Sequence, residues 1–264
     1  MHDLDLSRIC LQLKEEVRSI GRRLVDVQPQ EIKRQGRDVT TDLDVAISDR
    51  LRQSLLKIVP GSSVVTEEDS HRRAALPESA PAWLVDPIDG TGNLLTRYPV
   101  FATSVALFAG GETVLGVIYN PNNDEMFHAV ARGGAFLNDV PISVTSNDDI
   151  YESLVSTALP LDDEERLGSL RLIEGLSPFF RDIRIGGSAV LELAYVACGR
   201  LDCYFESRLA PWDVAAGRLL VAEAGGTVIE SRKVIVDNIH RADIVAANPV
   251  LADKWRRKIS ELHG

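Results

Sequence analysis

The amino-acid sequence predicts a layered α/β fold arranged in two lobes. Short apolar runs separated by turn-forming residues fill residues 100–145, a pattern typical of an antiparallel meander. After residue 150, helix-like and strand-like segments alternate, which is typical of layered α/β chains. The 264 residues are 45% hydrophobic and 26% charged, the composition of a globular chain long enough to bury a sizeable core.

The N-terminal third is expected to supply two helices and two buried strands. Apolar residues recur there at three- and four-residue steps, which predicts an amphipathic first helix: Leu6, Ile9, Leu13, Val17, Ile20 and Leu24. A second helix is expected over about residues 44–58, because Pro60 follows it. The apolar runs at 62–66 and 82–86 predict short strands, and Asp86 is expected to end the second because a proline follows it.

The remaining elements follow the same two periodicities. The meander is expected to contain strands at 100–108, 113–120, 125–130 and 141–145. Beyond it we expect helices near 163–176, 188–198, 213–224 and 249–262. Strands are expected near 182–185, 202–206, 227–230 and 243–247. We place the boundary between the lobes near residue 150, giving 1–150 and 151–264, although no linker marks it.

Charge and cysteine content exclude several classes of protein. The net charge of −10 and a pI near 5 disfavour non-specific binding to nucleic acid or to anionic membranes. Three cysteines without CxxC spacing indicate reduced thiols rather than a disulfide framework or a zinc site. We see no signal peptide and no run of 18 apolar residues. We therefore expect a cytoplasmic protein without a membrane partner.

Acidic residues lie next to apolar runs at three places in the chain. Asp86 and Asp89 follow the strand at 82–86, Glu67 and Glu68 follow the strand at 62–66, and Asp213 begins an apolar helix. Gly90 permits a tight turn, and Thr91 can open a short helix whose N–H groups favour an anion. Acids and an anion site are compatible only if a cation lies between them, and hard divalent cations prefer carboxylate and phosphate oxygens.

Each acidic stretch, taken singly, is also typical of an ordinary turn or helix cap. Other chemistries lack their motifs. The chain has no GxxxxGK[ST] loop and no GxSxG elbow. The residue two positions before Asp89 is Pro87, so the aspartate pair of haloacid-dehalogenase phosphatases is missing. The five histidines are scattered without an HExxH motif, which indicates surface or structural roles.

Two motifs resemble the signatures of the inositol monophosphatase family: "WLVDPIDGTGN" at 83–93 and "WDVAAGRLLVAEAGG" at 212–226. An acidic pair about 19 residues before the first motif and the interval between the motifs are also similar to that family. The resemblance implies a five-layer αβαβα sandwich of the inositol monophosphatase and fructose-1,6-bisphosphatase type. It also implies a lithium-sensitive phosphatase with two or three Mg²⁺ ions, assembled as a homodimer.

The resemblance assigns roles to particular positions. It implies metal ligands at Glu67, Asp86, the carbonyl of Ile88, Asp89 and Asp213. It implies a catalytic set of Thr91, Asp44 and Glu68, in which Asp44 hydrogen-bonds Thr91; Asp42 is the competing choice for that aspartate. It implies substrate contacts from Gly90, Thr91, Lys33, Gly187, Ser188, Ala189 and Glu206.

The substrate is expected to be a small phosphorylated molecule. Asn93 favours the inositol or sugar branch of the family, while Gly92 and Leu94 depart from it. The Glu206 carboxylate suits a polyol because it can accept hydrogen bonds from neighbouring hydroxyls. Inositol monophosphate is the leading substrate. The alternatives are fructose 1,6-bisphosphate, a 3′-nucleotide bisphosphate and histidinol phosphate. A regulatory protein that binds a macromolecular partner is the alternative from another class.

Overall fold

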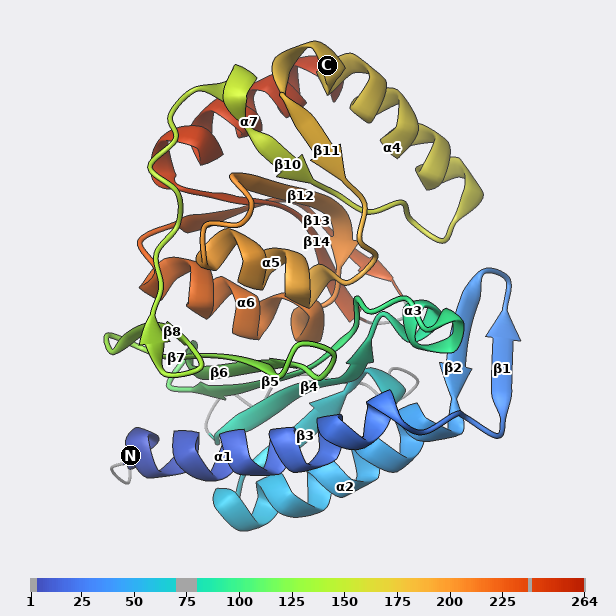
Figure 1. Ribbon diagram of the computed structural model, residues 1–264, viewed down its shortest axis with the longest axis vertical. Coiled ribbons are helices and arrows are strands. Elements are labelled where there is room, and N and C mark those ends of the chain that lie inside the picture. The colour runs from blue at the N-terminus through green and yellow to red at the C-terminus, as the bar shows by residue number, and fades with distance from the viewer. Residues whose placement is uncertain (1–3, 70–79, 237–238, 264) are drawn as a thin grey trace.

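The chain folds into five layers, as Figure 1 shows for a computed structural model that describes residues 4–69, 80–236 and 239–263. From one side to the other, the layers are a helix pair, a seven-stranded sheet, a second helix pair, a five-stranded sheet and a third helix pair. The three helix pairs are α1 (Leu6–Gly21) with α2 (Asp42–Ile58), α5 (Ala189–Ala197) with α6 (Pro211–Glu223), and α4 (Asp163–Leu176) with α7 (Pro249–His263). The expected αβαβα sandwich is confirmed.

The seven-stranded sheet contains the strands that the structure describes between residues 63 and 141, in the order β3-β4-β5-β6-β7-β8-β9. β3 (Ser63–Thr66) and β4 (Ala82–Asp89) are parallel, and the neighbours from β4 onward pair antiparallel. The others are β5 (Ala102–Ala109), β6 (Glu112–Asn120), β7 (Glu125–Val130), β8 (Gly134–Leu137) and β9 (Val140–Pro141).

Two strands in this sheet differ from the sequence prediction. β4 does not end at Asp86 but continues to Asp89, because the strand accommodates Pro87 with a register shift against β5. The strand predicted at 141–145 does not form beyond Pro141. The Val144 amide instead donates to the carbonyl of Ala224, which ties this segment to the end of α6.

The five-stranded sheet has the order β11-β10-β12-β14-β13. Its strands are β10 (Leu154–Ser156), β11 (Asp182–Arg184), β12 (Cys203–Leu209), β13 (Thr227–Val236) and β14 (Ile239–Ala247). β14 pairs antiparallel with both β12 and β13, and each of these two partners carries a bulge where it passes the same part of β14. The long β13–β14 pairing extends both strands well beyond their predicted ranges.

A hairpin of β1 (Ile32–Gln35) and β2 (Asp38–Thr41) projects beside α2 and α3 (Thr91–Thr96) and was not predicted (Figure 1). Its strands lack an alternating apolar face, because neither is buried in a sheet core. Gly36 forms the turn with a positive φ of 64°. The hairpin contributes residues to the candidate site.

α6 packs closely against both of its neighbours because small residues line its contacts. A Cβ on Gly116 of β6 would lie 2.9 Å from the Ala216 Cα, and one on Gly217 would lie 2.5 Å from the Leu193 side chain of α5. The backbone of β6 at Gly116 and the Leu193 side chain of α5 therefore lie so close to α6 that only glycine fits at Gly116 and Gly217 without a shift. This packing fixes the N-terminal end of α6 opposite the end of β4. None of the helices within the described ranges is long and apolar enough to cross a bilayer.

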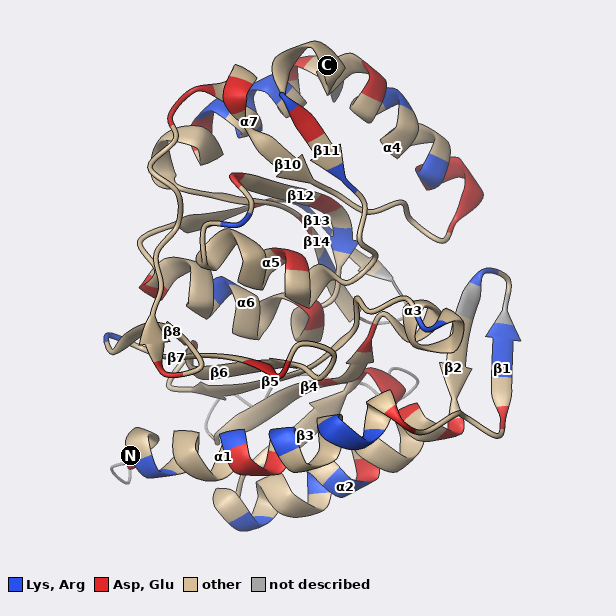
Figure 2. Ribbon diagram, in the orientation of Figure 1, with Lys and Arg blue, Asp and Glu red and all other residues tan. Residues whose placement is uncertain are grey.

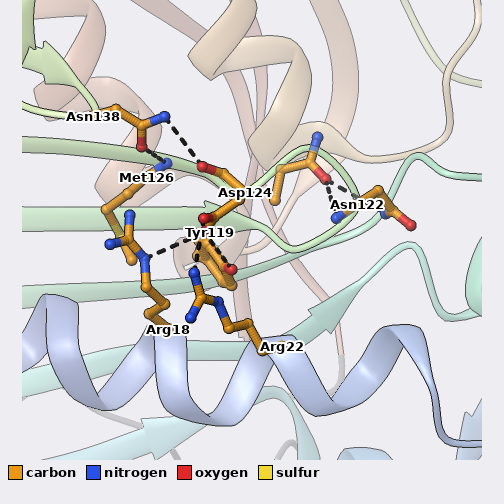
Figure 3. Close-up of polar contacts among 8 residues, drawn as sticks. Arg18, Arg22, Tyr119, Asn122, Asp124, Met126 and Asn138 are labelled. Atoms are coloured by element: carbon orange, nitrogen blue, oxygen red, sulfur yellow. Dashed lines mark hydrogen bonds and ion pairs between the residues drawn. The ribbon is translucent and has the colours of Figure 1, made fainter.

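A polar cluster fastens α1 to the turn between β6 and β7 (Figure 3). Asp124 accepts hydrogen bonds from the Tyr119 hydroxyl and from Arg22, each at 2.8 Å, and Arg18 lies 3.3 Å away. The Asn138 amide donates to the Asp124 carbonyl at 3.1 Å. Because hydrogen bonds from Tyr119 and Arg22 stabilise its charged form, the pKa of Asp124 lies below its usual range.

Candidate active site

A cavity of about 510 Å³ opens where several elements end. The end of β4, the start of α3, the start of α6 and the β1–β2 hairpin contribute side chains, as do β12 and residues 158–162. Figure 2 shows acidic segments at the facing ends of β4 and α6. The cavity lies within the range of about 300–1,000 Å³ that is usual for ligand pockets. The four carboxylates predicted as metal ligands line it: Glu67, Asp86, Asp89 and Asp213.

Asp86 is the most deeply buried of these carboxylates, at 2% exposure. Its Oδ1 atom is buried and has no hydrogen-bond partner within the part of the chain that the structure describes. Removal from water, followed by repulsion from Glu67, Asp89 and Asp213, raises the pKa of Asp86 well above its ordinary value. A buried carboxylate with an unpartnered oxygen is costly unless a cation binds it.

Glu67 reaches the same cavity from the short helix η2 (Glu67–Asp69) that follows β3. Glu67 as a whole residue is exposed, whereas its carboxylate lies among the other acids of the cavity. Loss of hydration and repulsion from Asp213 and Glu68 raise the pKa of Glu67 well above its ordinary value. The two strand ends, β3 and β4, therefore deliver negative charge to one place.

Asp89 and Asp213 each have one carboxylate oxygen held by protein donors. Asp89 accepts from the Ser188 hydroxyl at 2.6 Å and from the Val190 amide at 2.8 Å. Asp213, the third residue of α6, accepts from the Ala210 amide at 2.7 Å. Burial raises the pKa of Asp89 to about 6; burial and the nearby Asp89 raise the pKa of Asp213 to about 7. No hydrogen bond fixes the other oxygen of either residue in the described structure, so each can serve a ligand.

The chemistry of this donor set fits a hard divalent cation. All four side chains offer oxygen only, and the buried Asp86 Oδ1 atom has no hydrogen-bond partner among residues 4–69, 80–236 and 239–263. In the described ranges, however, no three His, Cys, Asp or Glu side chains are already gathered as a formed metal cage. The four acids face one cavity, and a cation bound among them would offset the mutual repulsion that raises the pKa values of Glu67 and Asp86.

Thr91 lies beside the acids at the start of α3. Its Oγ1 is 2.9 Å from Asp44 Oδ1 and 2.9 Å from the carbonyl oxygen of Ile88. Asp44, 2% exposed, also accepts from the Thr41 amide at 2.7 Å and the Thr41 hydroxyl at 2.6 Å. Burial raises the pKa of Asp44, and these hydrogen bonds oppose the rise. The competing residue, Asp42, instead accepts from the amides at 30 and 31.

The loop before α5 forms another wall of the cavity. Gly187, with a φ of 79°, and Ala189 line the cavity, as does Gly90 at the start of α3. Ser188 was expected to contact substrate, but it is 1% exposed and its hydroxyl donates to Asp89. Ser188 is therefore placed to orient the Asp89 carboxylate rather than to contact a ligand.

Two residues that sequence reasoning did not assign to the site hold this loop in place. The Asn93 side-chain amide lies 2.6 Å from the Val100 carbonyl and 2.9 Å from the Gly186 carbonyl. Glu192, 4% exposed, accepts from the Gly186 amide at 3.2 Å. Burial raises the pKa of Glu192 to about 7. A buried glutamate in an apolar helix was the available sequence signal for this role.

Glu206 lines the cavity from β12 and is hydrogen-bonded by the hydroxyl of the buried Tyr204. Burial raises the pKa of Glu206 to about 8, and the Tyr204 hydrogen bond opposes the rise. A carboxyl with this pKa is largely protonated at neutral pH. Glu206 can then donate one hydrogen bond and accept others, which differs from the charged acceptor expected from the sequence.

Lys33 and Glu68 are not among the described residues that line the cavity. Lys33 lies exposed on β1, where it pairs with Thr40, and Glu68 acts through its charge on Glu67. From the same hairpin, Arg37 and Val39 reach the cavity instead. Spacing along the sequence could not distinguish these residues, because their placement depends on how the hairpin folds over the site.

The wall formed by the C-terminal half is rich in residues that the sequence did not indicate. It includes Glu165, Arg208 and Arg241 together with residues 158–162. Arg208 pairs with Glu165, and Arg241 Nη1 donates to the Arg208 carbonyl at 3.1 Å. These arginines carry no motif, and they meet at the cavity only because two strands pair side by side.

The chain is similar to known proteins over nearly its whole length. A profile of the inositol monophosphatase family matches residues 3–263. An inositol monophosphatase of Dictyostelium discoideum is 36% identical over 76% of this chain and 78% of that protein. The Nus factor SuhB of Haemophilus influenzae is 37% identical over 73% and 72%. The crystal structure of extragenic suppressor protein suhB from Bartonella henselae has a TM-score of 0.84 at 32% identity, covering 94% of this chain and 97% of that one.

Proposed function

The chain belongs to the inositol monophosphatase family, and we propose that it is a magnesium-dependent phosphatase for a small polyol or sugar phosphate monoester. Family membership supports phosphatase activity. Inositol monophosphate is the proposed substrate. The observation that carries the proposal is the set of four carboxylates around one cavity, in which the buried Asp86 Oδ1 atom has no hydrogen-bond partner from any described residue.

The proposed ligands of two or three Mg²⁺ ions are Glu67, Asp86, Asp89, Asp213 and the carbonyl of Ile88. When bound, the ions would neutralise the phosphate dianion and lower the pKa of a coordinated water. The protein itself positions the phosphate. Gly90 supplies the turn at the start of α3, in a left-handed conformation that favours glycine, and it lines the cavity. A Cβ there would lie 2.9 Å from the Val100 carbonyl oxygen.

Thr91 is proposed to orient the attacking water. When its hydroxyl donates to Asp44, the Thr91 oxygen presents lone pairs toward the cavity and can accept a hydrogen bond from water. Asp44 is held by Thr41 and has a raised pKa, so it can share the proton that Thr91 gives up. Water held in this way is aimed at the phosphate, and proton movement from water through Thr91 to Asp44 assists its attack.

Glu206 and Ala189 are proposed to face the alcohol part of the substrate, because they line the cavity from β12 and α5. A protonated Glu206 donates to one hydroxyl and accepts from its neighbour, which suits a polyol. Glu206→Gln keeps the shape and both hydrogen-bonding functions. It should therefore alter kcat/KM less than Glu206→Leu, which removes about 1–3 kcal/mol of binding when a partner is left unsatisfied.

The deciding experiment is phosphate release from a panel of esters with and without Mg²⁺. The panel comprises inositol 1-phosphate, fructose 1,6-bisphosphate, a 3′-nucleotide bisphosphate, histidinol phosphate and an aryl phosphate. We expect Mg²⁺-dependent turnover that a chelator abolishes, greatest with the inositol ester. Lithium is expected to inhibit by competing at the site near Asp213. Absence of turnover with every ester would reject the proposal.

A second candidate function is binding of a macromolecular partner. Relatives named Nus factor SuhB are 36–37% identical to this chain, which is as similar as the inositol monophosphatases. Pull-down with the Asp86→Asn variant separates the two functions, because that variant should lose turnover and keep its outer surface. We further propose a cytoplasmic homodimer. Light scattering of the purified protein tests the dimer, and cell fractionation tests the location.

A further inference from the structure

A second cavity, of about 300 Å³, adjoins the first, and Leu209 and Arg241 line both. It opens between the seven-stranded sheet, the first turns of α6 and the β13–β14 pair. None of the four carboxylates of the first cavity is among the described residues that line it. Its volume lies at the lower end of the range of about 300–1,000 Å³ that is usual for ligand pockets. The proposed phosphatase mechanism makes no use of this second cavity.

The walls of the second cavity are mainly apolar. Leu84 and Phe108 line it from the seven-stranded sheet, and the start of α6 adds Pro211, Val214 and Ala215. Leu84, Val214 and Ala215 are buried, and Phe108 is half-buried. These walls favour a ligand with an aromatic or branched hydrocarbon body, because binding removes apolar surface from water.

The second cavity also carries two cations that share one acid. Glu230 of β13 pairs with Arg218 of α6 and lies 3.1 Å from the Lys233 Nζ atom. Neither cation has another ion-pair partner among the described residues, so the three side chains together carry one excess positive charge. Partial burial lowers the pKa of Arg218, so an additional anion beside it is favourable.

We propose that the second cavity binds a small amphipathic organic anion that has an aromatic or branched hydrocarbon body and one carboxylate. The body lies against Leu84, Phe108 and Val214. The carboxylate accepts hydrogen bonds from Arg218 and Lys233. Arg218 carries five N–H donors, which is more than the Glu230 carboxylate can use. The ligand is not the substrate, so this site goes beyond the proposed phosphatase function.

The second cavity lies next to Asp213. Its lining includes Ala210, whose amide donates to Asp213 at 2.7 Å, and Val214, the next residue in α6. Arg241 lines both cavities, and its charge opposes the rise in the pKa of Asp213. An anion in the second cavity would offset part of this positive charge, so a cation at Asp213 would be held more tightly. Ligand and Mg²⁺ should therefore bind cooperatively, a consequence that rests on the proposed role of Asp213 as a metal ligand.

The test uses 2-naphthoate as the ligand and 2-naphthalenemethanol, which has the same rings without the charge, as its neutral analogue. Calorimetry on metal-free protein measures binding under conditions in which the four acids of the first cavity repel an anion. Naphthoate should bind about tenfold more tightly than the alcohol, because it adds charge-assisted hydrogen bonds. Thr113→Trp, which fills the cavity from β6, should abolish binding of both compounds, and its thermal melt checks that it is folded.

Arg218→Gln should weaken naphthoate binding about tenfold and change binding of the alcohol less than about twofold. Arg50→Gln is the matched control and should change neither. The side chains of Arg50 and its partner Glu16 are 41% and 25% exposed, compared with 43% and 24% for the Arg218 pair. Arg50 is not among the described residues that line either cavity.

Equal affinity for naphthoate and the alcohol, or binding that survives in Thr113→Trp, would overturn the proposed site. Saturating naphthoate should lower the Kd of Mg²⁺ about fivefold in the wild type and leave it unchanged in Thr113→Trp. An unchanged Kd in the wild type would overturn the coupling to Asp213. A protein that binds naphthoate as expected but no Mg²⁺ would support the site and reject the magnesium-dependent phosphatase.

Discussion

Asp86 is the residue of the cavity whose buried carboxylate most lowers the stability of the metal-free protein. Its carboxylate is buried, one oxygen has no hydrogen-bond partner among the described residues, and four other acids add to the rise in its pKa. Protonation relieves this repulsion when no cation is bound. The folded state therefore binds protons that the unfolded state releases, so the contribution of these acids to the stability of the metal-free protein is most favourable below pH 4, where they are protonated in both states. It falls as the pH rises through the pKa values of about 6 and about 7 of Asp89 and Asp213.

Asp86→Asn should therefore stabilise the metal-free protein while abolishing its activity. At pH 8 we expect an increase of about 1–3 kcal/mol in the free energy of unfolding, because an unpaired buried charge is removed. The gain should shrink as the pH falls toward 4. Urea unfolding in a chelator at several pH values measures it. Mg²⁺ should stabilise the wild type and not the variant, and a variant less stable than wild type at pH 8 would contradict this account.

Asn93 tests how precisely the loop before α5 must be held. Asn93→Ala removes the amide that bonds the carbonyls of Val100 and Gly186, so the loop should shift relative to α3. A displacement of about 1 Å can cost on the order of 100-fold in rate. We expect a 10- to 100-fold lower kcat with an unchanged Mg²⁺ half-saturation. A change confined to Mg²⁺ affinity would place Asn93 among the supports of the metal ligands instead.

The sequence showed the acids of the site more clearly than its other residues. Asp86 and Asp89 interrupt apolar runs, and that contrast is visible without a structure. Ser188 was assigned to the substrate, but its hydroxyl contacts Asp89, which a linear pattern cannot reveal. Arg208 and Arg241 were missed because strand pairing brings them to the cavity. Their neighbours along the chain carry no signal of that pairing.

At the scale of elements, the position of α6 determines where Asp213 lies. α6 meets the seven-stranded sheet at Gly116. The atoms nearest to a Cβ placed on Gly116 would be backbone atoms of Ala216 in α6. Helix periodicity predicted α6, and it could not predict how closely the helix approaches the sheet. The small residues at the contact set that distance. The N-terminal end of α6 then faces β4.

Gly116→Ala should push α6 away from the sheet. The added Cβ would lie 2.9 Å from the Ala216 Cα and 3.0 Å from its carbonyl oxygen, and backbone cannot turn aside as a side chain can. We expect a loss of about 1–3 kcal/mol in stability, the usual cost of overpacking, and weaker Mg²⁺ binding because Asp213 moves. Thermal melts and a Mg²⁺ titration measure both effects.

The matched control for this change is Gly168→Ala in α4, where an added Cβ would meet nothing within 4 Å. Alanine there should stabilise by about 0.4–1 kcal/mol because it reduces the freedom of the unfolded chain. If both variants lose stability equally, the effect of Gly116→Ala is not a packing effect. If Gly116→Ala keeps wild-type Mg²⁺ affinity, α6 does not set the position of Asp213.

Across the whole molecule, the two halves of the chain share one apolar core. One cluster of buried residues joins strands before residue 150 to helices and strands after it: Leu84, Ala106, Ile118 and Phe127 with Ala194, Ala216 and Ala246. α5 and α6 belong to the second half but cover the sheet of the first half (Figure 1). We therefore propose that residues 1–150 and 151–264 are two lobes of one folding unit.

A fragment of residues 1–150 should fail to fold alone, because its sheet would expose the face that α5 and α6 cover in the whole chain. Apolar burial is the main driving force of folding, and an uncovered sheet face favours aggregation instead. We expect a fragment without a cooperative melt that binds a hydrophobic dye. Co-expression with residues 151–264 should restore a folded, Mg²⁺-binding complex. A fragment with its own cooperative melt would show two independent domains, and the cavity between β4 and α6 would then be an interface that can open.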